Sequence, residues 1–363
     1  MSAQEQNRSV WTRLDNCPIS PARNPGVDTL GRQGMLFSSR VWLDPWLTAF
    51  GGAECGYWTP RDAEVDLKIA YTIETVKIGP LALRIGKAAA NCHTPRYDVS
   101  GHVAPSMLQL RDMMVDLGVS ALSFPYLAPT SLLLKSTESR STEASWLRSP
   151  CEDAPFINCR GDWSTYLDSR GSTRQMSWRK YEKRMLRSGG CFEVLSSWED
   201  ISSSLPEVLH VEASGWKGRS GSSISQDPTT RRFYEDVCNR LANLGKLRLF
   251  LIRCHGRIIA FQIATLDLGV LTGLKASYLE EFAKESPGQV LQLWITRWAF
   301  ESSQVHLYDL LGPPSEYKMR FATGLDPLET LLVFSRTLGG TVARLRWSVA
   351  PRIKRLVRGF IKV

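Results

Sequence analysis

Three apolar segments that follow one another across short, glycine-containing gaps place the strongest constraint on the fold. They cover residues 247–254, 257–266 and 270–278, and the gaps hold His255-Gly256 and Asp267-Leu268-Gly269. Short gaps of this kind are typical of antiparallel neighbours joined by tight turns. The pattern therefore predicts an antiparallel meander of three strands.

A helix and a further strand follow the meander. Apolar residues recur at helical spacing between residues 291 and 299, and residues 305–311 form the next apolar run before Gly312-Pro313-Pro314. The order of elements is therefore meander, loop, helix and strand. Together with the helices expected earlier in the chain, it predicts an α+β fold.

The start of that helix has the most informative local sequence, Ser286-Pro287-Gly288-Gln289. Serine is a preferred N-cap, proline suits the first helical position, and glycine lets another group approach the backbone. The free N–H groups of a helix start can bind a phosphate or a carboxylate without a lysine. An ordinary capped helix is the alternative interpretation.

The residues before the meander predict further helices and one strand. Asp162 is a good N-cap, and Thr173 begins a basic helix that Gly189-Gly190 should end before a strand at residues 191–195. A helix from Leu205 to about Ser214 leads into a Gly/Ser-rich loop, and Asp227-Pro228 begins another helix. The basic helix is either a solvated face or a wall for a phosphate.

The chain divides into five expected regions. Residues 1–35 form a polar leader rich in Pro and Gly, and residues 36–134 form a first unit that opens with an aromatic helix in FSSRVWLDPWLTAFGG and has strands at residues 67–71 and 81–85. Residues 135–149 are a linker without an apolar face, residues 150–340 form the second unit, and residues 341–363 form a basic amphipathic tail helix.

Composition narrows the class of protein. The net charge is +9, but residues 343–363 hold seven Lys and Arg and no Asp or Glu. Most of the positive charge therefore lies in the C-terminal segment, and neither a basic face on the folded body nor a nucleic-acid partner is expected. The eight Cys and five His lack metal-ligand spacing, which predicts reduced thiols and no metal. The N-terminal residues lack an apolar core of a signal peptide, so a cytoplasmic location is expected.

Several short motifs in order resemble a known family. They are Glu212-Ala-Ser-Gly-Trp216-Lys217-Gly218, Arg232-Phe233-Tyr234, Lys275-Ala-Ser-Tyr278, Ser286-Pro287-Gly288 and Asp309-Leu-Leu-Gly312 with Tyr317-Lys318. Their order and spacing resemble the GNAT-fold acyltransferases, in particular the CelD/BcsL branch named for cellulose biosynthesis, related to FemAB-type transferases. The resemblance covers residues 160–325, and the helix near residue 40 extends it to a degenerate, GNAT-like N-terminal half.

This resemblance implies an acyl-CoA-dependent transfer to an amine of a small metabolite, an amino sugar or a biosynthetic precursor. Acyl-CoA is then a co-substrate, with no permanently bound cofactor, and its pyrophosphate lies at the helix start formed by Ser286, Pro287, Gly288, Gln289 and Val290. The acyl-pantetheine lies where the strand at residues 270–278 splays from the strand at residues 305–311. FemAB relatives take aminoacyl groups from tRNA instead, which is the alternative donor.

Acyl transfer needs a base for the acceptor ammonium and donors for the oxyanion or the thiolate. Glu212 and Asp309 are the candidate bases, and Tyr278 and Tyr317 are the candidate donors. Trp216 and Lys217 in the Gly-rich loop, with Lys318, are the candidate substrate-binding residues. A structural role remains the alternative for each of these residues.

The basic tail leaves two interpretations open. Its apolar stripe either packs onto the body of the protein or lies on an anionic membrane as a peripheral contact. A catalytically inactive GNAT-like module that binds a partner is the non-enzymatic alternative to the acyltransferase.

Overall fold

The computed structural model describes residues 36–61, 66–138, 145–214, 224 and 226–348. These residues form two compact units. Among these residues, those within 153–326 belong to unit 1, and those within 36–152 and 327–348 belong to unit 2. Two strands, β6 (Ser145–Asn158) and β12 (Gly324–Phe334), carry the chain from unit 2 into unit 1 and back.

The meander predicted from the sequence is confirmed in unit 1. The strands are β7 (Gly190–Leu195), β8 (Leu247–Cys254), β9 (Arg257–Asp267) and β10 (Val270–Tyr278), each antiparallel to the next. Strand β11 (Leu307–Asp309) is parallel to β10 and antiparallel to β6. Nearly every residue of β9 is buried, so this strand forms the centre of the unit's core.

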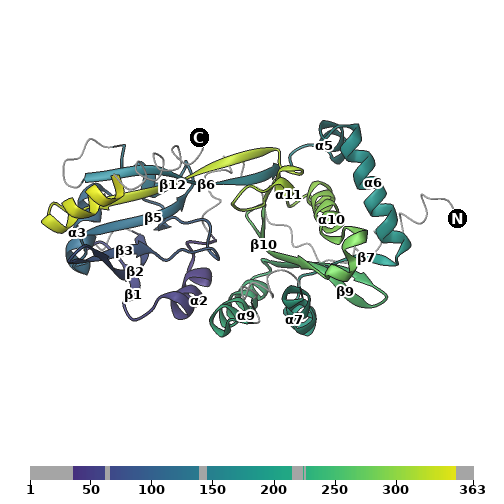
Figure 1. Cartoon of the computed structure of the whole chain (residues 1–363), viewed down its shortest axis with the longest axis horizontal. Helices are drawn as coiled ribbons and strands as arrows, with labels where there is room; N and C mark the ends of the chain where they lie inside the picture. The colour runs from purple at the N-terminus through teal and green to yellow at the C-terminus, as the bar shows by residue number, and fades with distance from the viewer. Residues whose placement is uncertain (1–35, 62–65, 139–144, 215–223, 225, 349–363) are drawn as a thin grey trace. The chain divides into compact units, whose positions relative to one another are not determined.

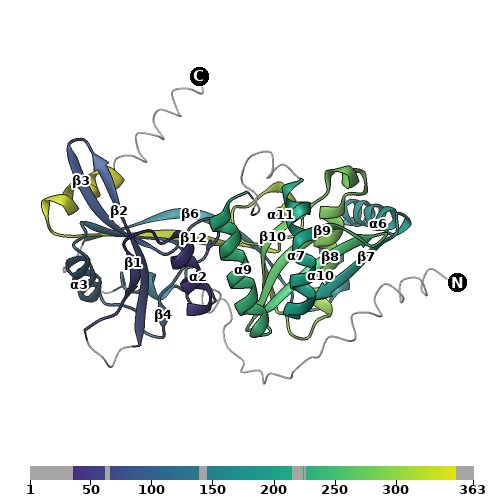
Figure 2. The same cartoon turned by 90° about the horizontal axis from the view of Figure 1, so that it is seen from below.

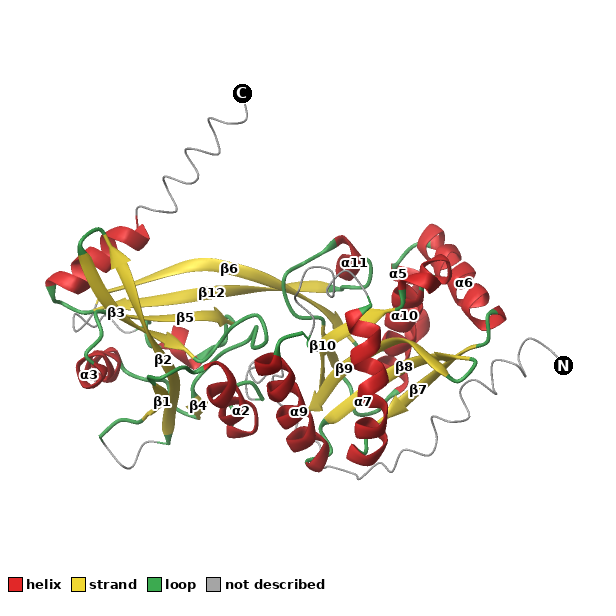
Figure 3. Cartoon of the chain, turned by 60° about the horizontal axis from the view of Figure 1, so that its bottom comes forward, coloured by secondary structure: helices red, strands yellow, loops and turns green. Residues whose placement is uncertain are grey.

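Helices cover both faces of this sheet (Figures 1 and 3). On one face lie α7 (Trp198–Ala213) and α9 (Pro228–Asn243), which pack against β9 and β8 respectively. On the other lie α10 (Pro287–Glu301) and, packed on it, α5 (Trp163–Ser169) and α6 (Ser172–Arg187). Two short helices, η3 (Glu280–Glu285) and α11 (Glu316–Met319), flank α10 and β11 in the chain.

The caps predicted before α5 and α9 are present. The Asp162 carboxylate accepts from Thr165 N at 2.9 Å, and the Asp227 carboxylate accepts from Thr229 N and Thr230 N. These bonds satisfy N–H groups that have no partner within the helix. By contrast, α7 begins seven residues before the predicted start at Leu205, because Ser197 caps it and Pro206 is accommodated inside it.

Strands β10 and β11 pair over only three residues. The register joins Val270 to Leu307, Leu271 to Tyr308 and Thr272 to Asp309, after which β10 continues to Tyr278 beside β9 alone. A β-bulge between Gly273 and Lys275 lies directly after the point where β10 separates from β11. The splay expected between these two strands is therefore present, and it opens at Asp309.

Unit 2 contains a run of paired strands (Figure 2). Its order is β1 (Cys55–Trp58), β2 (Leu67–Ile78), β3 (Leu81–Ala88), β5 (Ala121–Leu127) and β12, with the two-residue β4 (Ser100–Gly101) beside β2. Its helices are α2 (Arg40–Phe50), α3 (Met107–Leu117) and α4 (Leu132–Lys135), and residues 338–348 are also helical. Strand β5 is parallel to β3 and antiparallel to β12.

The two units repeat one order of elements. Apart from the short η3 and β4, it is β8, β9, β10, α10 and β11 in unit 1 and β1, β2, β3, α3 and β5 in unit 2. In both, an antiparallel run is followed by a helix and then by a strand parallel to the last one. The expected tandem of two similar halves is thus the architecture of the chain.

The boundaries differ from those predicted. Residues 327–340 were expected to belong with residues 150–326, which form unit 1. Instead, β12 pairs with β5 there, and these residues belong to unit 2. Residues 145–149, expected as linker, are the first part of β6, where Arg148 forms an ion pair with Glu329. The linker interpretation was wrong here because a strand that is half exposed carries polar residues and so looks like a loop in sequence.

The beginning of the predicted tail packs on unit 2. Ala343 is buried in a cluster with Ile85 and Phe334, and Val342 and Trp347 lie against that cluster. Leu345, expected on the same apolar stripe, is 59% exposed. The remaining stripe residues, from Val349 on, and the predicted leader lie outside the described residues.

Candidate functional site

The start of α10 lacks the side-chain cap that its sequence predicts. Ser286 has φ 56°, and its backbone carbonyl accepts from Gln289 N at 3.0 Å and from Val290 N at 3.1 Å. Pro287 has no N–H. In the first turn of α10, the N–H of Gly288 is therefore the one that has no acceptor in the described part of the chain. The predicted serine cap was wrong, but the open helix start that it was expected to form is present.

Two predicted tyrosines lie at this helix start. The Tyr317 hydroxyl donates to the Gly288 carbonyl at 3.0 Å, and a Cβ atom on Gly288 would lie 3.3 Å from the Tyr278 ring. Burial raises the pKa of Tyr317, and the neighbouring Tyr308 and Tyr278 raise it further. The Tyr317 phenol therefore stays protonated at neutral pH and acts as a hydrogen-bond donor to Gly288. Tyr278 is 39% exposed.

A buried polar cluster lies where β10 departs from β11. Gln262 of β9 donates to the Tyr308 hydroxyl, and Gln292 of α10 bonds the same phenol. The Tyr317 hydroxyl lies 3.5 Å from Gln292 Oε1, so the cluster continues to the helix start. Gly273 makes room for it, since a Cβ atom there would lie 2.4 Å from Gln262 Nε2.

Asp309 stands at the point where the strands part. It is 1% exposed, and its Oδ1 accepts from Leu311 N at 2.9 Å. Lys318 holds the same turn, since its ammonium donates to the carbonyls of Leu311 at 2.8 Å and Gly312 at 3.1 Å. The structure thus uses Lys318 to tie the turn after β11, a role that the sequence interpretation did not include.

Glu212 is the other predicted base. It is fully buried at the end of α7, a helix that also packs against β9 and β10. Its Oε2 accepts from Ile224 N at 2.8 Å, whereas its Oε1 is buried without a hydrogen-bond partner among the described residues. An unpaired buried carboxylate oxygen is costly, and such atoms occur at sites that bind a ligand or move a proton.

Trp216 and Lys217, the predicted substrate-binding pair, lie outside the described residues. Within the described ranges, no cluster of His, Cys, Asp or Glu is arranged to hold a metal ion. None of the helices in those ranges combines the length and apolarity needed to cross a bilayer.

A cavity of about 490 Å³ opens beside the start of α10. Gln289 lines it together with residues of the α5–α6 turn and of α6, which include Arg170 and Arg174, and with Arg320, which directly follows α11. Trp178 and Tyr181 contribute ring walls, and Trp178 is held by stacking on Phe321 at 4.7 Å. The polar lining therefore carries three guanidinium groups and no carboxylate.

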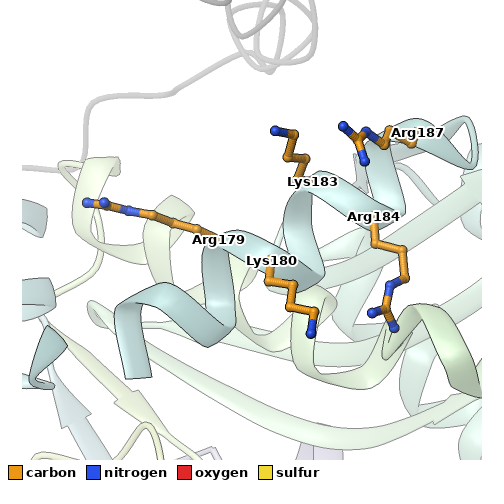
Figure 4. Close-up of a pocket in the computed structure, with 5 residues that line it drawn as sticks. All are labelled: Arg179, Lys180, Lys183, Arg184 and Arg187. Atoms are coloured by element: carbon orange, nitrogen blue, oxygen red, sulfur yellow. The ribbon is translucent and has the colours of Figure 1, made fainter. Parts of the chain in front are cut away.

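The outer surface of α6 carries a second concentration of charge (Figure 4). Five cations surround a shallow hollow of about 360 Å³: Arg179, Lys180, Lys183, Arg184 and Arg187. Lys180 and Arg184 point to one side of the helix, and Lys183 and Arg187 point to the other. Because these cations spread over both sides of the helix, the surface is better suited to an extended anion than to a single phosphate.

Comparison with known proteins agrees with this geometry. Residues 172–319 match the family model described as acetyltransferase (GNAT) domain. Unit 1 has the GNAT fold. The match begins at α6 and ends at α11, so it includes the basic helix, the meander, the open start of α10 and the β10–β11 splay. The CelD/BcsL branch is not distinguished by this match, and a search of curated proteins finds no significant match.

Solved structures extend the likeness to most of the chain. The C-terminal domain of a putative lysylphosphatidylglycerol synthetase from Agrobacterium fabrum has a TM-score of 0.54 at 12% identity, over 89% of this chain and 94% of that chain. FemX has a TM-score of 0.52 at 12% identity, over 95% and 98% of the two chains. The L-PGS structure from Bacillus licheniformis has a TM-score of 0.50 at 14% identity, over 86% and 96%. At these identities the likeness shows the shared fold of the GNAT domain and its partner unit.

Sequence reasoning missed the residues that line the splay and part of the arginine cavity. Gln262 and Gln292 are polar residues inside an apolar strand and an apolar helix, and this local exception was the available signal. Arg170 and Arg320 lie 150 positions apart in sequence and share a cavity only through the packing of unit 1. No spacing rule connects such a pair.

Proposed function

We propose that unit 1 transfers an acyl group from acyl-CoA to an amine of a small metabolite, an amino sugar or a biosynthetic precursor. One observation carries this proposal: β10 and β11 part after the Thr272–Asp309 pair, and α10, which follows β10 and η3 in the chain, offers a free backbone N–H in its first turn. The gap can take an extended pantetheine arm, and the helix start with its partial positive charge can take the pyrophosphate.

The proposed reaction is direct attack on the thioester. The acceptor amine loses a proton to a base and its nitrogen bonds to the carbonyl carbon; the C–S bond then breaks, and the CoA thiolate takes a proton. We assign the base to Glu212, because its buried Oε1 lacks a partner in the described chain, and a donor role to Tyr278, which is 39% exposed beside the start of α10. Asp309 then positions the turn after β11 through Leu311.

Calorimetric titration of the full chain with acetyl-CoA, CoA and a long-chain acyl-CoA tests the donor. We expect micromolar binding, and the Gly288→Trp variant should lose at least about tenfold in affinity, because the indole covers the helix start beside Tyr278. Unchanged secondary structure and melting temperature in the variant are the control. Equal CoA affinity of the two proteins would contradict the placement of the pyrophosphate.

A second donor is supported by the cations on α6. An aminoacyl-tRNA, the donor of the FemAB-type transferases, would place its phosphates along Lys183 and Arg187, and such binding weakens steeply with salt. RNA binding that falls with salt, together with no binding of any CoA species, would favour this donor. Binding of neither donor would favour an inactive module.

A further inference from the structure

The cavity beside the start of α10 carries more positive charge than its structural bonds use. Arg174 donates one Nη to the Arg320 carbonyl at 2.8 Å, and Arg170 donates one Nη to the Ala322 carbonyl at 2.7 Å. These bonds fix the two side chains at the cavity. Arg170 also donates its Nε to Ser169 Oγ at 3.1 Å. Each guanidinium keeps further N–H donors at the cavity, which can bind an anion.

Arg320 is the third arginine that lines the cavity. Its one ion pair in the described chain joins it to Glu316, whose side chain is 86% exposed, so the pair is weak in water. Glu316 does not line the cavity. Three arginines with spare donors around one hollow form a typical site for a phosphate, because a planar guanidinium binds phosphate oxygens in pairs.

The other lining groups fit a nucleotide rather than a free ion. The Tyr181 and Trp178 rings offer flat walls, and Gln289 Oε1 is buried without a hydrogen-bond partner among the described residues. This oxygen is an acceptor, so it needs an N–H or O–H of the ligand, which a ribose or an adenine supplies and a phosphate at neutral pH does not. The volume is within the range of about 300–1,000 Å³ typical of small-molecule sites.

We infer that this cavity binds the 3′-phosphoadenosine end of coenzyme A, with Arg170, Arg174 and Arg320 on the 3′-phosphate and Gln289 on the nucleoside. The inference rests on the proposed function, since Gln289 joins the cavity to the helix start assigned to the pyrophosphate. It adds a residue set that selects coenzyme A against carriers lacking that phosphate.

The test compares coenzyme A with 3′-dephospho-coenzyme A by calorimetry on the full chain. We expect the wild-type chain to bind coenzyme A about tenfold to a hundredfold more tightly, which is the effect of a charge-assisted phosphate contact. The Arg320→Gln and Arg174→Gln variants should bring this ratio close to one and leave the affinity for 3′-dephospho-coenzyme A unchanged. Adenosine 3′,5′-bisphosphate should compete with coenzyme A, and adenosine 5′-monophosphate should compete far less.

Arg240→Gln is the matched control, because it removes the same charge from α9 on the opposite face of the sheet. It should keep the wild-type ratio. A wild-type ratio near one, or a ratio that Arg320→Gln and Arg174→Gln leave unchanged, would overturn the cavity assignment while the proposed function stands. Failure of both nucleotides to bind would instead overturn the proposed function, and the inference with it.

Discussion

Two serines precede corresponding helices, and the backbone conformation of each serine determines whether the glutamine three residues later can form a capping box. Ser106 and Ser286 each stand three residues before a glutamine, the sequence of a capping box. In unit 2 the box forms, since the Ser106 hydroxyl accepts from Gln109 N and the Gln109 side chain accepts from Ser106 N. In unit 1 the left-handed conformation of Ser286 prevents this, and Gln289 lines the arginine cavity instead.

At the same scale, the two candidate bases can be separated by isosteric substitution. Glu212→Gln should lower kcat by at least about a hundredfold, the usual size of a general-base effect, with little change in CoA affinity. The amide oxygen can still accept from Ile224 N, so the fold should persist. Steady-state kinetics and calorimetry on the purified variant are the measurements.

Asp309→Asn is the comparison for that experiment. The asparagine oxygen can still accept from Leu311 N, so a positioning role predicts a smaller loss of kcat than in Glu212→Gln. The reverse order of losses would move the base to Asp309.

At the scale of elements, the strands were more predictable than the site that they form. The glycine gaps and apolar runs of β8, β9 and β10 are local signals, and the observed bounds differ from the predicted ones by one residue at most. The three-residue β11 is shorter than the predicted residues 305–311, because pairing with β10 ends where the strands part. The point where the pairing ends depends on contacts among Gly273, Gln262 and Tyr308. These residues come from three different strands, so no local sequence pattern predicts their contact.

Gly273 offers a test of the splay. Gly273→Ala should destabilise the chain by about 1–3 kcal/mol, because the new methyl group would overlap Gln262 in a packed interior. It should also weaken CoA binding, since Gln262 and Tyr308 must shift. Urea unfolding and calorimetry are the measurements.

Gly56→Ala in β1 is the matched control, because a Cβ atom there lies 3.7 Å from the nearest atom, Tyr71 Oη. It should be neutral or slightly stabilising. A Gly273→Ala variant as stable as Gly56→Ala would show that the splay is not held by this contact.

At the scale of the whole molecule, both units bury phenols. Burial raises the pKa of Tyr97 in unit 2 and of Tyr308 and Tyr317 in unit 1. The folded chain therefore keeps protons that the unfolded chain releases above about pH 10, so their stabilising effect is complete below that pH and is lost as the pH rises.

We accordingly expect the free energy of unfolding to fall above about pH 10, by about 1.4 kcal/mol per pH unit for each such tyrosine. Urea unfolding at pH 8, 10 and 11 measures it. Tyr308→Phe should reduce the slope between pH 10 and 11, and a stability that stays level over this interval would contradict the buried, protonated state of these phenols.

The division into units was the least predictable feature of the molecule. A polar stretch suggested a boundary near residue 149, yet β6 runs through that point, and unit 2 is completed only by β12. The apolar alternation of β12 identifies a strand but not its partner, because pairing of β12 with β5 joins residues about two hundred positions apart. Local pattern does not encode such pairings.

The return of the chain through β12 also orders events during synthesis. When the ribosome has made the first 152 residues, β5 has its partner β3 but no β12, and its open edge can pair with other chains. The described residues of unit 1 all lie within 153–326 and can fold as they emerge, whereas unit 2 must wait for residue 334. The strands of unit 2 made before residue 153 thus wait for β12, and the unpaired edge of β5 needs protection throughout the translation of residues 153–326.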